Sequence, residues 1–277
     1  MAPIREGRVA PGVAFVTGGA RGLGNAVAMS FAKEGASAVA IVDWASEEPM
    51  AKAKAGIESF GTKCITIYAD VTKEDEIRGA VEKAAATFGR IDYAANFAGV
   101  AVKEGLTWEM PYETWRKVIN VNQDGVWLSM KYELAQMVKQ TPIEFEDGRE
   151  KARGAIVNCA SIGSIQAGAR STGYASSKHA VAGFTKAAAL EARQFGIRVN
   201  AVSPGFLRTH LLDDVVGDAQ QSTGNDFFTQ NEARQGRRAD FSEIGDATVL
   251  LCNPRMSLVN GHNLVVDGGF TINATNY

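Results

Sequence analysis

The chain is poor in the residue types that mark secreted, metal-binding and disulfide-stabilised proteins. Its 277 residues include only three cysteines, Cys64, Cys159 and Cys252, and three histidines that are scattered singly. An odd number of widely separated cysteines forms no disulfide framework, and no pair has the spacing of metal ligands. We therefore expect buried thiols, a reducing compartment and no metal site.

Long apolar runs and a strong net charge are also missing. No stretch approaches the roughly eighteen consecutive apolar residues of a membrane span, and residues 1–11 lack the apolar core of a signal peptide. The formal net charge is −2, which gives no electrostatic reason to expect nucleic acid or an anionic membrane as partner. We expect a cytoplasmic protein that binds a small neutral or amphipathic molecule.

What the chain does contain is a regular alternation of strand-like and helix-like segments. Hydrophobic residues at 45% and charged residues at 22% match an ordinary globular domain with a sizeable core. Short β-branched runs bounded by glycine predict strands at 12–17, 38–42, 64–68, 91–95, 155–160, 197–202 and 263–266. Helical patterns fall at 25–33, 47–60, 73–88, 113–137, 172–195 and 241–252. The alternation predicts one α/β domain over residues 1–277, a doubly wound Rossmann-type parallel sheet of seven strands flanked by helices.

A glycine-rich loop joins the first predicted strand to the first predicted helix. It reads Gly18-Gly19-Ala20-Arg21-Gly22-Leu23-Gly24. In such a setting, glycines let the backbone approach a pyrophosphate, whose charge is met by free N–H groups and the helix dipole. The Gly-x3-Gly-x-Gly spacing differs from the commoner Gly-x-Gly-x2-Gly fingerprint, so a plain tight turn is the alternative. We expect a dinucleotide here.

Acidic residues follow the second and third predicted strands. Asp43 can accept both hydroxyls of an adenosine ribose, and it would repel a 2′-phosphate by about 4 kcal/mol at 4 Å in an effective dielectric of 20. This favours NAD, although Arg21 could hold that phosphate and keeps NADP open. The alternative role for Asp43 is a helix cap, which Ser46 could itself supply. Asp70, followed by Val71, contacts either the adenine ring or the turn before a helix capped by Thr72, and the spacing does not separate these.

Ser161, Tyr174 and Lys178 form the candidate catalytic group. Tyr174 and Lys178 lie four residues apart, so on a helix they share one face. An ammonium beside a phenol favours the phenolate, which makes the phenol a better acid–base group near neutral pH. Ser161 closes a buried strand, at the end where open α/β sheets place their active sites. The alternative is a solvated helix face.

Other segments depart from regular patterns. The cluster Asn120-Val121-Asn122-Gln123-Asp124-Gly125 weakens the long helix that contains it, and such local conflicts are often functional. Residues 141–153 predict an exposed loop, and residues 207–236 a flexible lid over the substrate. Candidate walls of the substrate site are Val100, Ile162, Ser164, Ala169 and Phe206, which are mostly apolar or small and suggest a hydrophobic cyclic or aromatic ketone.

Taken together, these motifs resemble the short-chain dehydrogenase/reductase family from Pro11 to Gly269. In order they are Thr17-Gly18-x3-Gly22-x-Gly24, Asp70-Val71, Asn96-x-Ala98-Gly99, Asn122, Ser161, Tyr174-x3-Lys178, Pro204-Gly205 and Asp267-Gly268-Gly269. One departure is Phe97, which stands where the family has the second asparagine of Asn-Asn-Ala-Gly. A hydrogen bond is therefore expected to be missing there, with Asn96 still facing the cofactor.

The resemblance implies a catalytic tetrad of Asn122, Ser161, Tyr174 and Lys178. Ser161 would hydrogen-bond the substrate oxygen, and Tyr174 would exchange its proton. Lys178 would hold the nicotinamide ribose, and Asn122 would fix a water that links Lys178 to solvent. The motifs and the resemblance together place the cofactor against Gly18, Arg21, Gly22, Leu23, Gly24, Asp43, Asp70, Val71, Asn96, Ala98, Gly99, Tyr174, Lys178, Pro204, Gly205, Leu207 and Thr209. A homo-oligomer, tetramer or dimer, built on the two long helices is also implied.

The sequence thus predicts an NAD(P)-dependent oxidoreductase that interconverts a secondary alcohol and a ketone. An alternative keeps the fold and cofactor but catalyses an epimerisation, a dehydration or oxidative ring chemistry. A further alternative is a non-catalytic cofactor-binding scaffold, which would be expected to have a damaged tetrad. Stoichiometric turnover of cofactor separates net redox chemistry from epimerisation.

Overall fold

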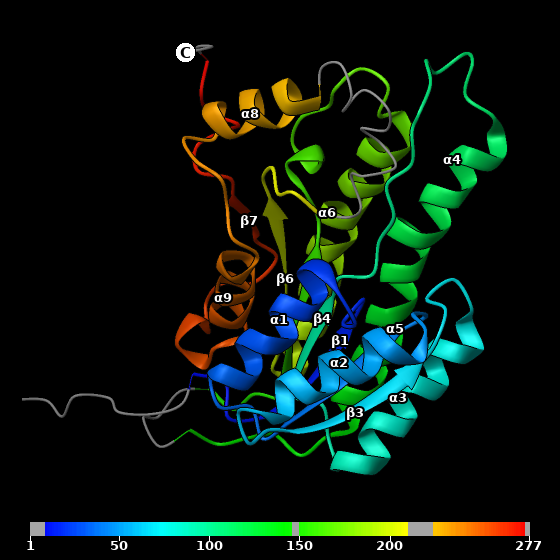
Figure 1. Cartoon of the computed structure of the whole chain (residues 1–277). Coiled ribbons are helices and arrows are strands. Elements are labelled where there is room, and N and C mark those ends of the chain that lie inside the picture. The colour runs from blue at the N-terminus through cyan, green and yellow to red at the C-terminus, as the bar shows by residue number, and fades with distance from the viewer. Residues whose placement is uncertain (1–8, 146–149, 210–223, 275–277) are drawn as a thin grey trace, which may run out of the picture.

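The protein is built on one parallel sheet of seven strands, in the order β3-β2-β1-β4-β5-β6-β7 (Figure 1). The computed structural model describes residues 9–145, 150–209 and 224–274. The strands are β1 (Val13–Thr17), β2 (Ala38–Asp43), β3 (Lys63–Tyr68), β4 (Tyr93–Asn96), β5 (Gly154–Cys159), β6 (Ile197–Pro204) and β7 (Asn263–Val266). The chain runs outward from β1 to β3 and then returns to β4 beside β1, which confirms the doubly wound sheet.

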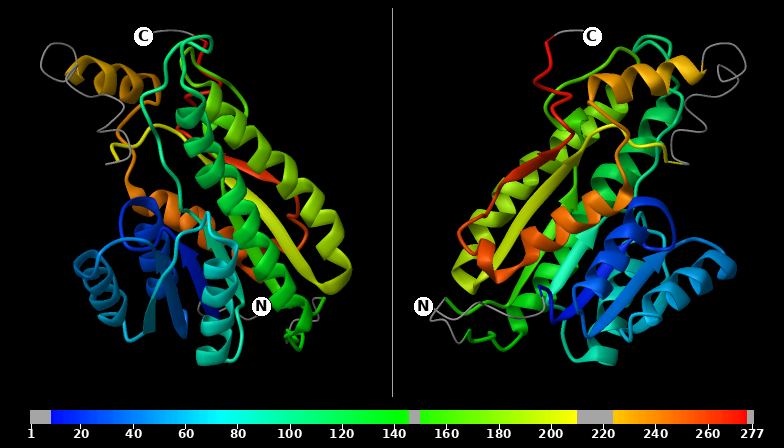
Figure 2. Two further views of the ribbon diagram at one scale, coloured as in Figure 1. Left: turned by 90° about the vertical axis from the view of Figure 1, so that its right-hand side faces the viewer. Right: turned by 60° about the vertical axis from the view of Figure 1, so that its left-hand side comes forward.

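Helices cover both faces of the sheet (Figure 2). One face carries α1 (Gly22–Lys33), α2 (Glu47–Glu58) and α9 (Phe241–Cys252). The opposite face carries α3 (Glu74–Phe88), α5 (Val126–Lys139) and α6 (Thr172–Ala192). Strands buried on both faces consist almost entirely of apolar residues, which is why their sequences read as continuous hydrophobic runs.

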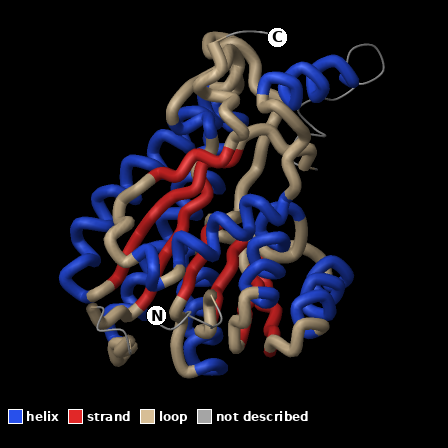
Figure 3. Tube along the Cα trace, turned by 90° about the vertical axis from the view of Figure 1, so that its left-hand side faces the viewer, coloured by secondary structure: helices blue, strands red, loops and turns tan. Residues whose placement is uncertain are grey.

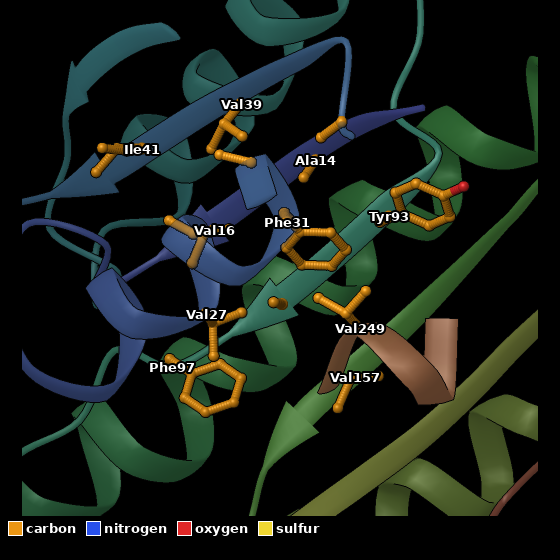
Figure 4. Close-up of a cluster of buried hydrophobic side chains, with 14 of the residues drawn as sticks. Ala14, Val16, Val27, Phe31, Val39, Ile41, Tyr93, Phe97, Val157 and Val249 are labelled. Carbon is orange, nitrogen blue, oxygen red and sulfur yellow. The ribbon is translucent and has the colours of Figure 1, made fainter. Parts of the chain in front are cut away.

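The core between β4 and the α1/α9 face shows how these layers are held (Figure 4). Phe31 of α1 stacks on Tyr93 of β4 with ring centroids 5.5 Å apart, and Val249 of α9 belongs to the same buried cluster. A fully buried side chain of this kind contributes roughly 1.5–3 kcal/mol to stability. This packing lies beside the start of β1, because Tyr93 pairs with Ala14, and the glycine loop departs from the other end of that strand.

The helix expected over residues 113–137 is divided by a π-helical turn. The segments are α4 (Tyr112–Ile119), the π turn at Asn120–Gly125 and α5. Gly125 packs so closely on the turn that follows β3 that an added Cβ would lie 2.7 Å from Val71 Cγ2. The predicted interruption is therefore real, and π turns inside α-helices are frequent at functional sites.

Two segments expected to be irregular contain ordered structure. Residues 143 and 152 form an antiparallel bridge, with Ile143 N–H donating to Ala152 O at 2.7 Å and the reverse bond at 3.1 Å, so the exposed loop has a paired stem. Within the segment predicted as a lid, Gly224–Arg234 forms the helix α8. Residues 210–223 of that segment lie outside the described residues. Of the helices in the described ranges, none has the length and apolar character needed to cross a membrane.

The carboxyl ends of the parallel strands meet at one edge of the sheet. The glycine loop after β1, the turn after β4, the turn after β5 and Pro204 of β6 all lie there because every strand runs in the same direction. Figure 3 shows α8 beyond this same end of the sheet. The candidate site lies at this edge, where α/β sheets bind ligands.

Candidate active site

Ser161 and Tyr174 flank a single glycine beyond the end of β5. Ser161 Oγ accepts a hydrogen bond from Gly163 N–H at 3.0 Å, which leaves the hydroxyl proton available for another acceptor. A Cβ added at Gly163 would lie 3.4 Å from Ser161 Oγ and 3.3 Å from Tyr174 Cε1. The serine hydroxyl and the tyrosine ring are thus brought together, although twelve residues lie between them in the sequence.

Lys178 lies one turn further along α6 and is 4% exposed. Its Nζ donates to the carbonyl of Cys159 at 2.8 Å and lies 5.7 Å from the centroid of the Tyr174 ring. One of the three ammonium protons is therefore used by β5, and two remain for other acceptors. The ammonium and the phenol ring therefore lie near each other on one face of α6, as the spacing predicts.

Both polar atoms of the Asn122 side chain bond the backbone of Val100. Its Oδ1 accepts from Val100 N–H and its Nδ2 donates to Val100 O, both at 2.8 Å, and the residue has no exposed surface. From its place in the π turn, Asn122 thus anchors the start of the loop that follows Gly99. The expectation that Asn122 fixes a water linked to Lys178 stays a prediction.

The glycine loop has the conformation of a phosphate cradle. Gly18 and Gly22 have positive φ angles of 68° and 59°, which side chains other than glycine rarely adopt. No side chain caps the N-terminus of α1, and a Cβ added at Gly22 would meet nothing within 4 Å. Leu23 is partly buried against the core, and Arg21 is exposed. Open space beside uncapped backbone N–H groups suits an anionic ligand.

Asp43 is held at the end of β2 by two backbone amides. Its Oδ2 accepts from Ala20 N–H in the glycine loop, and its Oδ1 accepts from Ala45 N–H, both at 3.0 Å. The residue is 8% exposed. Ser46 stands at the N-cap of α2 but makes no side-chain cap bond, so the capping expected of it is wrong. The carboxylate therefore links the loop to β2 and retains free lone pairs on both oxygens.

The Asp70 side chain stabilises the turn that follows β3, which is one of the two roles that its position in the sequence left open. Its Oδ1 accepts from both N–H and Oγ1 of Thr72, at 2.9 and 2.8 Å. Thr72 does not cap the next helix, because α3 begins at Glu74 after an N-cap at Lys73. Val71 is buried against Gly125. A contact between Asp70 and an adenine ring stays a prediction.

The expectation that the Asn96 side chain faces the cofactor is wrong. Asn96 is 0% exposed, and its Nδ2 donates to Glu133 Oε2 at 2.9 Å and to Asn158 Oδ1 at 3.0 Å. In a strand, successive side chains alternate between faces, and here the amide falls on the face covered by α5. Only the backbone of Asn96 could contact a ligand.

Phe97 compensates for the missing amide with apolar packing. Its ring joins the core near Val27 (Figure 4), and its N–H donates to Thr17 Oγ1 at 3.2 Å. Ala98 N–H also donates to Thr17 Oγ1, at 3.3 Å. Gly99 approaches Asn122, whose Oδ1 would lie 3.3 Å from an added Cβ. The backbone of this turn is therefore bonded without a second asparagine.

Glu133 of α5 is a wholly buried carboxyl that the sequence patterns did not single out. Burial raises its pKa to about 8, against which the hydrogen bond from Asn96 acts only weakly. Two acceptors of this pair, Asn96 Oδ1 and Glu133 Oε1, have no hydrogen-bond partner within the described ranges. A protonated carboxyl offers a donor to such an environment, and burial keeps Glu133 protonated well above the ordinary range of a carboxyl.

We predict that Glu133→Gln makes the protein more stable at alkaline pH. The folded state holds the Glu133 proton from the normal value of 4.5 up to about 8, so the wild-type free energy of unfolding falls with rising pH across that window. The slope is about 1.4 kcal/mol per pH unit at most. The amide of the variant stays neutral across this window. The melting temperatures of the two proteins should therefore agree near pH 4.5 and diverge in favour of the variant as the pH approaches about 8. A difference that does not change with pH would contradict this.

The end of β6 is bound to the segment after α8 through Gln235, which is 4% exposed. Its Oε1 accepts from Phe206 N–H at 2.8 Å and its Nε2 donates to Phe206 O at 3.1 Å. A Cβ on Gly205 would overlap Gln235 Oε1, which explains the glycine after Pro204. A bidentate ion pair between Arg208 and Glu232, with N–O distances of 2.6 and 2.8 Å, also joins the segment after β6 to α8.

Leu207 and Thr209, expected at the nicotinamide carboxamide, differ in their environment. The Leu207 side chain is buried in the core, so only its backbone could reach a ligand. Thr209 is partly exposed, with its N–H bonded to Leu207 O at 2.9 Å. Of these two residues, Thr209 is therefore the one whose side chain is accessible to a ligand.

The hydroxyl of Ser164, an expected wall of the substrate site, is buried and bonded inside the protein. Its hydroxyl lies 3.0 Å from Ser203 Oγ and 2.9 Å from Asn263 Nδ2, and Ser203 Oγ donates to Asn263 Oδ1 at 2.7 Å. This closed triangle pins the short 3-10 helix Ile162–Ser164, which follows Ser161, to β6 and β7. It fixes the backbone on which the Ser161 hydroxyl is presented.

The cysteines and acidic residues show no other reactive centre in the described ranges. All three cysteines are free thiols, and burial raises the pKa of Cys64 and of Cys252 to about 12. Across the part of the chain that the structure describes, no group of three or more His, Cys, Asp or Glu residues could hold a metal ion.

Comparison with known proteins places this fold among oxidoreductases that act on CH–OH groups. A family model described as enoyl-(acyl carrier protein) reductase matches residues 18–271. The chain belongs to the short-chain dehydrogenase/reductase family. The family generally uses NAD or NADP.

Relatives of similar length support this assignment. Short-chain dehydrogenase fogB of Aspergillus ruber is 38% identical over 95% of this chain and 98% of that protein. Cyclohexanol dehydrogenase of an Acinetobacter species is 33% identical over 94% of each chain. The crystal structure of levodione reductase superposes with a TM-score of 0.85 and 30% identity, covering 96% of this chain and 99% of that one.

Proposed function

We propose that the protein interconverts a secondary alcohol and a ketone on a hydrophobic cyclic molecule, with Tyr174 as the general acid and base. The observation that carries the proposal is the convergence of the Ser161 hydroxyl and the Tyr174 ring on Gly163, with the Lys178 ammonium one turn away. Relatives named cyclohexanol dehydrogenase, levodione reductase and cis-4-hydroxycyclohexanecarboxylate dehydrogenase support a ring-bearing substrate.

The three side chains divide the proton chemistry among them. During reduction, the Ser161 hydroxyl donates a hydrogen bond to the ketone oxygen, and Tyr174 Oη gives that oxygen its proton as negative charge develops there. The Lys178 ammonium stabilises the phenolate that remains. Oxidation of the alcohol runs the same steps in reverse, with Tyr174 taking the hydroxyl proton. The nicotinamide, when bound, supplies or accepts the hydride.

The residues beside the glycine loop fit a dinucleotide. Uncapped N–H groups of α1 and the open space at Gly22 suit the pyrophosphate, Asp43 suits the adenosine ribose, and the free protons of Lys178 suit the nicotinamide ribose. We propose NAD as the preferred cofactor, because Asp43 is fixed by two amides and cannot swing away from a 2′-phosphate. The Arg21 side chain is exposed and so less firmly placed than this carboxylate.

A panel of cyclic and acyclic ketones and alcohols, assayed with both nicotinamide cofactors, tests the proposal. Stoichiometric oxidation of NADH with formation of a ring alcohol is the expected result. Substrate conversion without net consumption of cofactor would instead establish an epimerase or dehydratase. Cofactor binding with no conversion across the panel would favour a scaffold.

We predict that Asp43→Ala improves the use of NADP. Removal of the carboxylate abolishes a repulsion of about 4 kcal/mol at contact distance, most of which solvent and relaxation offset, so kcat/KM for NADP should rise about tenfold or more. Use of NAD should fall as the ribose hydroxyls lose an acceptor. Parallel kinetics with the two cofactors measure both effects, and a wild-type protein that already prefers NADP would overturn the proposed preference.

Exposed apolar side chains on the long helices support a homo-oligomer. Trp127 and Val138 of α5 and Leu190 of α6 are 46%, 37% and 62% exposed. We propose that copies of this chain pair through these helices in a dimer or tetramer, and a mass measurement in solution tests it. The three free thiols fit a reducing compartment such as the cytoplasm.

A further inference from the structure

Glu104 binds the first turn of α6, which carries Tyr174. Its Oε2 accepts from Gly173 N–H and its Oε1 from Tyr174 N–H, both at 2.7 Å. The side chain comes from the loop after β4, 70 residues before Tyr174, and is 7% exposed. A carboxylate that spans two adjacent amides fixes both the position and the direction of the helix start.

The surroundings of Glu104 are shaped to hold this carboxylate. A Cβ on Gly173 would lie 3.3 Å from Glu104 Oε1 and 3.3 Å from Trp115 Cδ1, so glycine leaves the room that the carboxylate occupies. No side chain from Ser171, the N-cap residue, caps α6. Glu104 therefore replaces the local cap that most helices carry.

The same loop also contacts Asn122. Val100 is bonded through both its N–H and its C=O to the Asn122 side chain, four residues before Glu104. Thr107 Oγ1 lies 2.7 Å from Thr172 Oγ1, which adds a second contact to the start of α6. The loop thus connects the π turn to the turn that bears the phenol.

We propose that Glu104 is a positioning residue for Tyr174, which orients the phenol through the backbone of α6. The inference rests on the proposed role of Tyr174 as acid and base. Glu104 holds the N–H of Tyr174 itself, whereas Lys178 lies beside the ring. The buried carboxylate also offsets the positive end of the helix dipole, which stabilises the start of α6.

The substitution Glu104→Gln tests the proposal. It preserves the shape, but one amide of α6 then faces an NH2 group in place of an acceptor, and the negative charge is gone. We expect kcat to fall about tenfold, and about a hundredfold in Glu104→Ala, since small displacements of a catalytic group cost that much. The dissociation constant of NADH should be unchanged, because Glu104 acts only through the backbone of α6.

A comparison of kcat with binding separates positioning from a loss of the fold. The wild type, Glu104→Gln and Glu104→Ala are compared in kcat, in the KM of the best substrate and in the dissociation constant of NADH, at a temperature well below the melting temperature of each protein. The expected result is a loss confined to kcat, which is smaller in the isosteric Glu104→Gln. Glu109→Gln is the matched control, because it removes the same charge from an exposed position of the same loop and should change neither kcat nor the melting temperature.

The outcomes separate the possible failures. A lower melting temperature in Glu104→Gln, with wild-type kcat, would show a helix cap without a role in positioning and would overturn the inference. If Tyr174→Phe retained wild-type turnover, the proposed function would fail. The inference fails separately if adding Glu104→Gln to Tyr174→Phe lowers kcat as much as it does in the wild type, because Glu104 would then act on something other than the phenol. Should Glu104→Ala not fold, the isosteric Glu104→Gln carries the same test.

Discussion

Replacing Tyr174 by phenylalanine is expected to lower kcat by about a thousandfold, because the substitution removes only the proton that the substrate oxygen must gain or lose. The ring and its packing beside Gly163 are preserved. Lys178 keeps its bond to the Cys159 carbonyl and so stays in place. Binding of NADH should therefore remain at the wild-type level, and the loss should appear in kcat.

Steady-state kinetics with the best substrate of the panel, combined with NADH binding by fluorescence, measures this split. Phe195→Tyr is a suitable control for protein preparation and assay. Phe195 lies in the short 3-10 helix that follows α6, at the opposite end of α6 from Tyr174. Turnover of Tyr174→Phe within about tenfold of wild type would remove the phenol from its proposed role, because general acid–base groups contribute more than that.

Replacing Gly24 by alanine should weaken both the fold and the binding of cofactor. The added Cβ would overlap the carbonyl oxygen of Gly18 and lie 2.6 Å from its carbonyl carbon and 3.1 Å from Thr17 O. These are backbone atoms at the end of β1, so α1 must move away from the sheet. Overpacking of this kind costs about 3 kcal/mol, and the shifted amides should bind a pyrophosphate at least about tenfold more weakly.

Chemical denaturation and NADH titration of Gly24→Ala measure the two effects. Gly79→Ala is the matched control, because Gly79 lies within α3 and its added Cβ would meet nothing within 4 Å. Alanine in an open helical position is more stable than glycine by about 1 kcal/mol. Wild-type stability and wild-type NADH affinity in Gly24→Ala would show that the close approach of α1 to β1 is not required.

The fold was accessible from the sequence because its signals are local. Each strand is a short apolar run closed by a turn residue, and the order of strands and helices leaves few topologies for a parallel sheet. The grouping of Ser161, Tyr174 and Lys178 was likewise predictable, since a strand end and one helical turn determine it. These predictions needed no knowledge of contacts between distant segments.

The contacts that fix the site were not accessible in this way. Glu104 lies in an irregular loop without periodicity, so nothing in the sequence indicates that it reaches α6. The direction of Asn96 depends on which face of β4 is covered by Glu133 of α5, a pairing across 37 residues. Gln235 and Phe206 meet only because the chain returns after an excursion of 29 residues.

The hydroxyl and amide triangle of Ser164, Ser203 and Asn263 ties the last strand to the segment that presents Ser161. Asn263 begins β7, and its side chain steadies the short helix directly after Ser161. Under the proposed role of Ser161, a truncation that removes Asn263 should therefore lower turnover. Engineered fusions and circular permutants should leave the pairing of β6 with β7 intact.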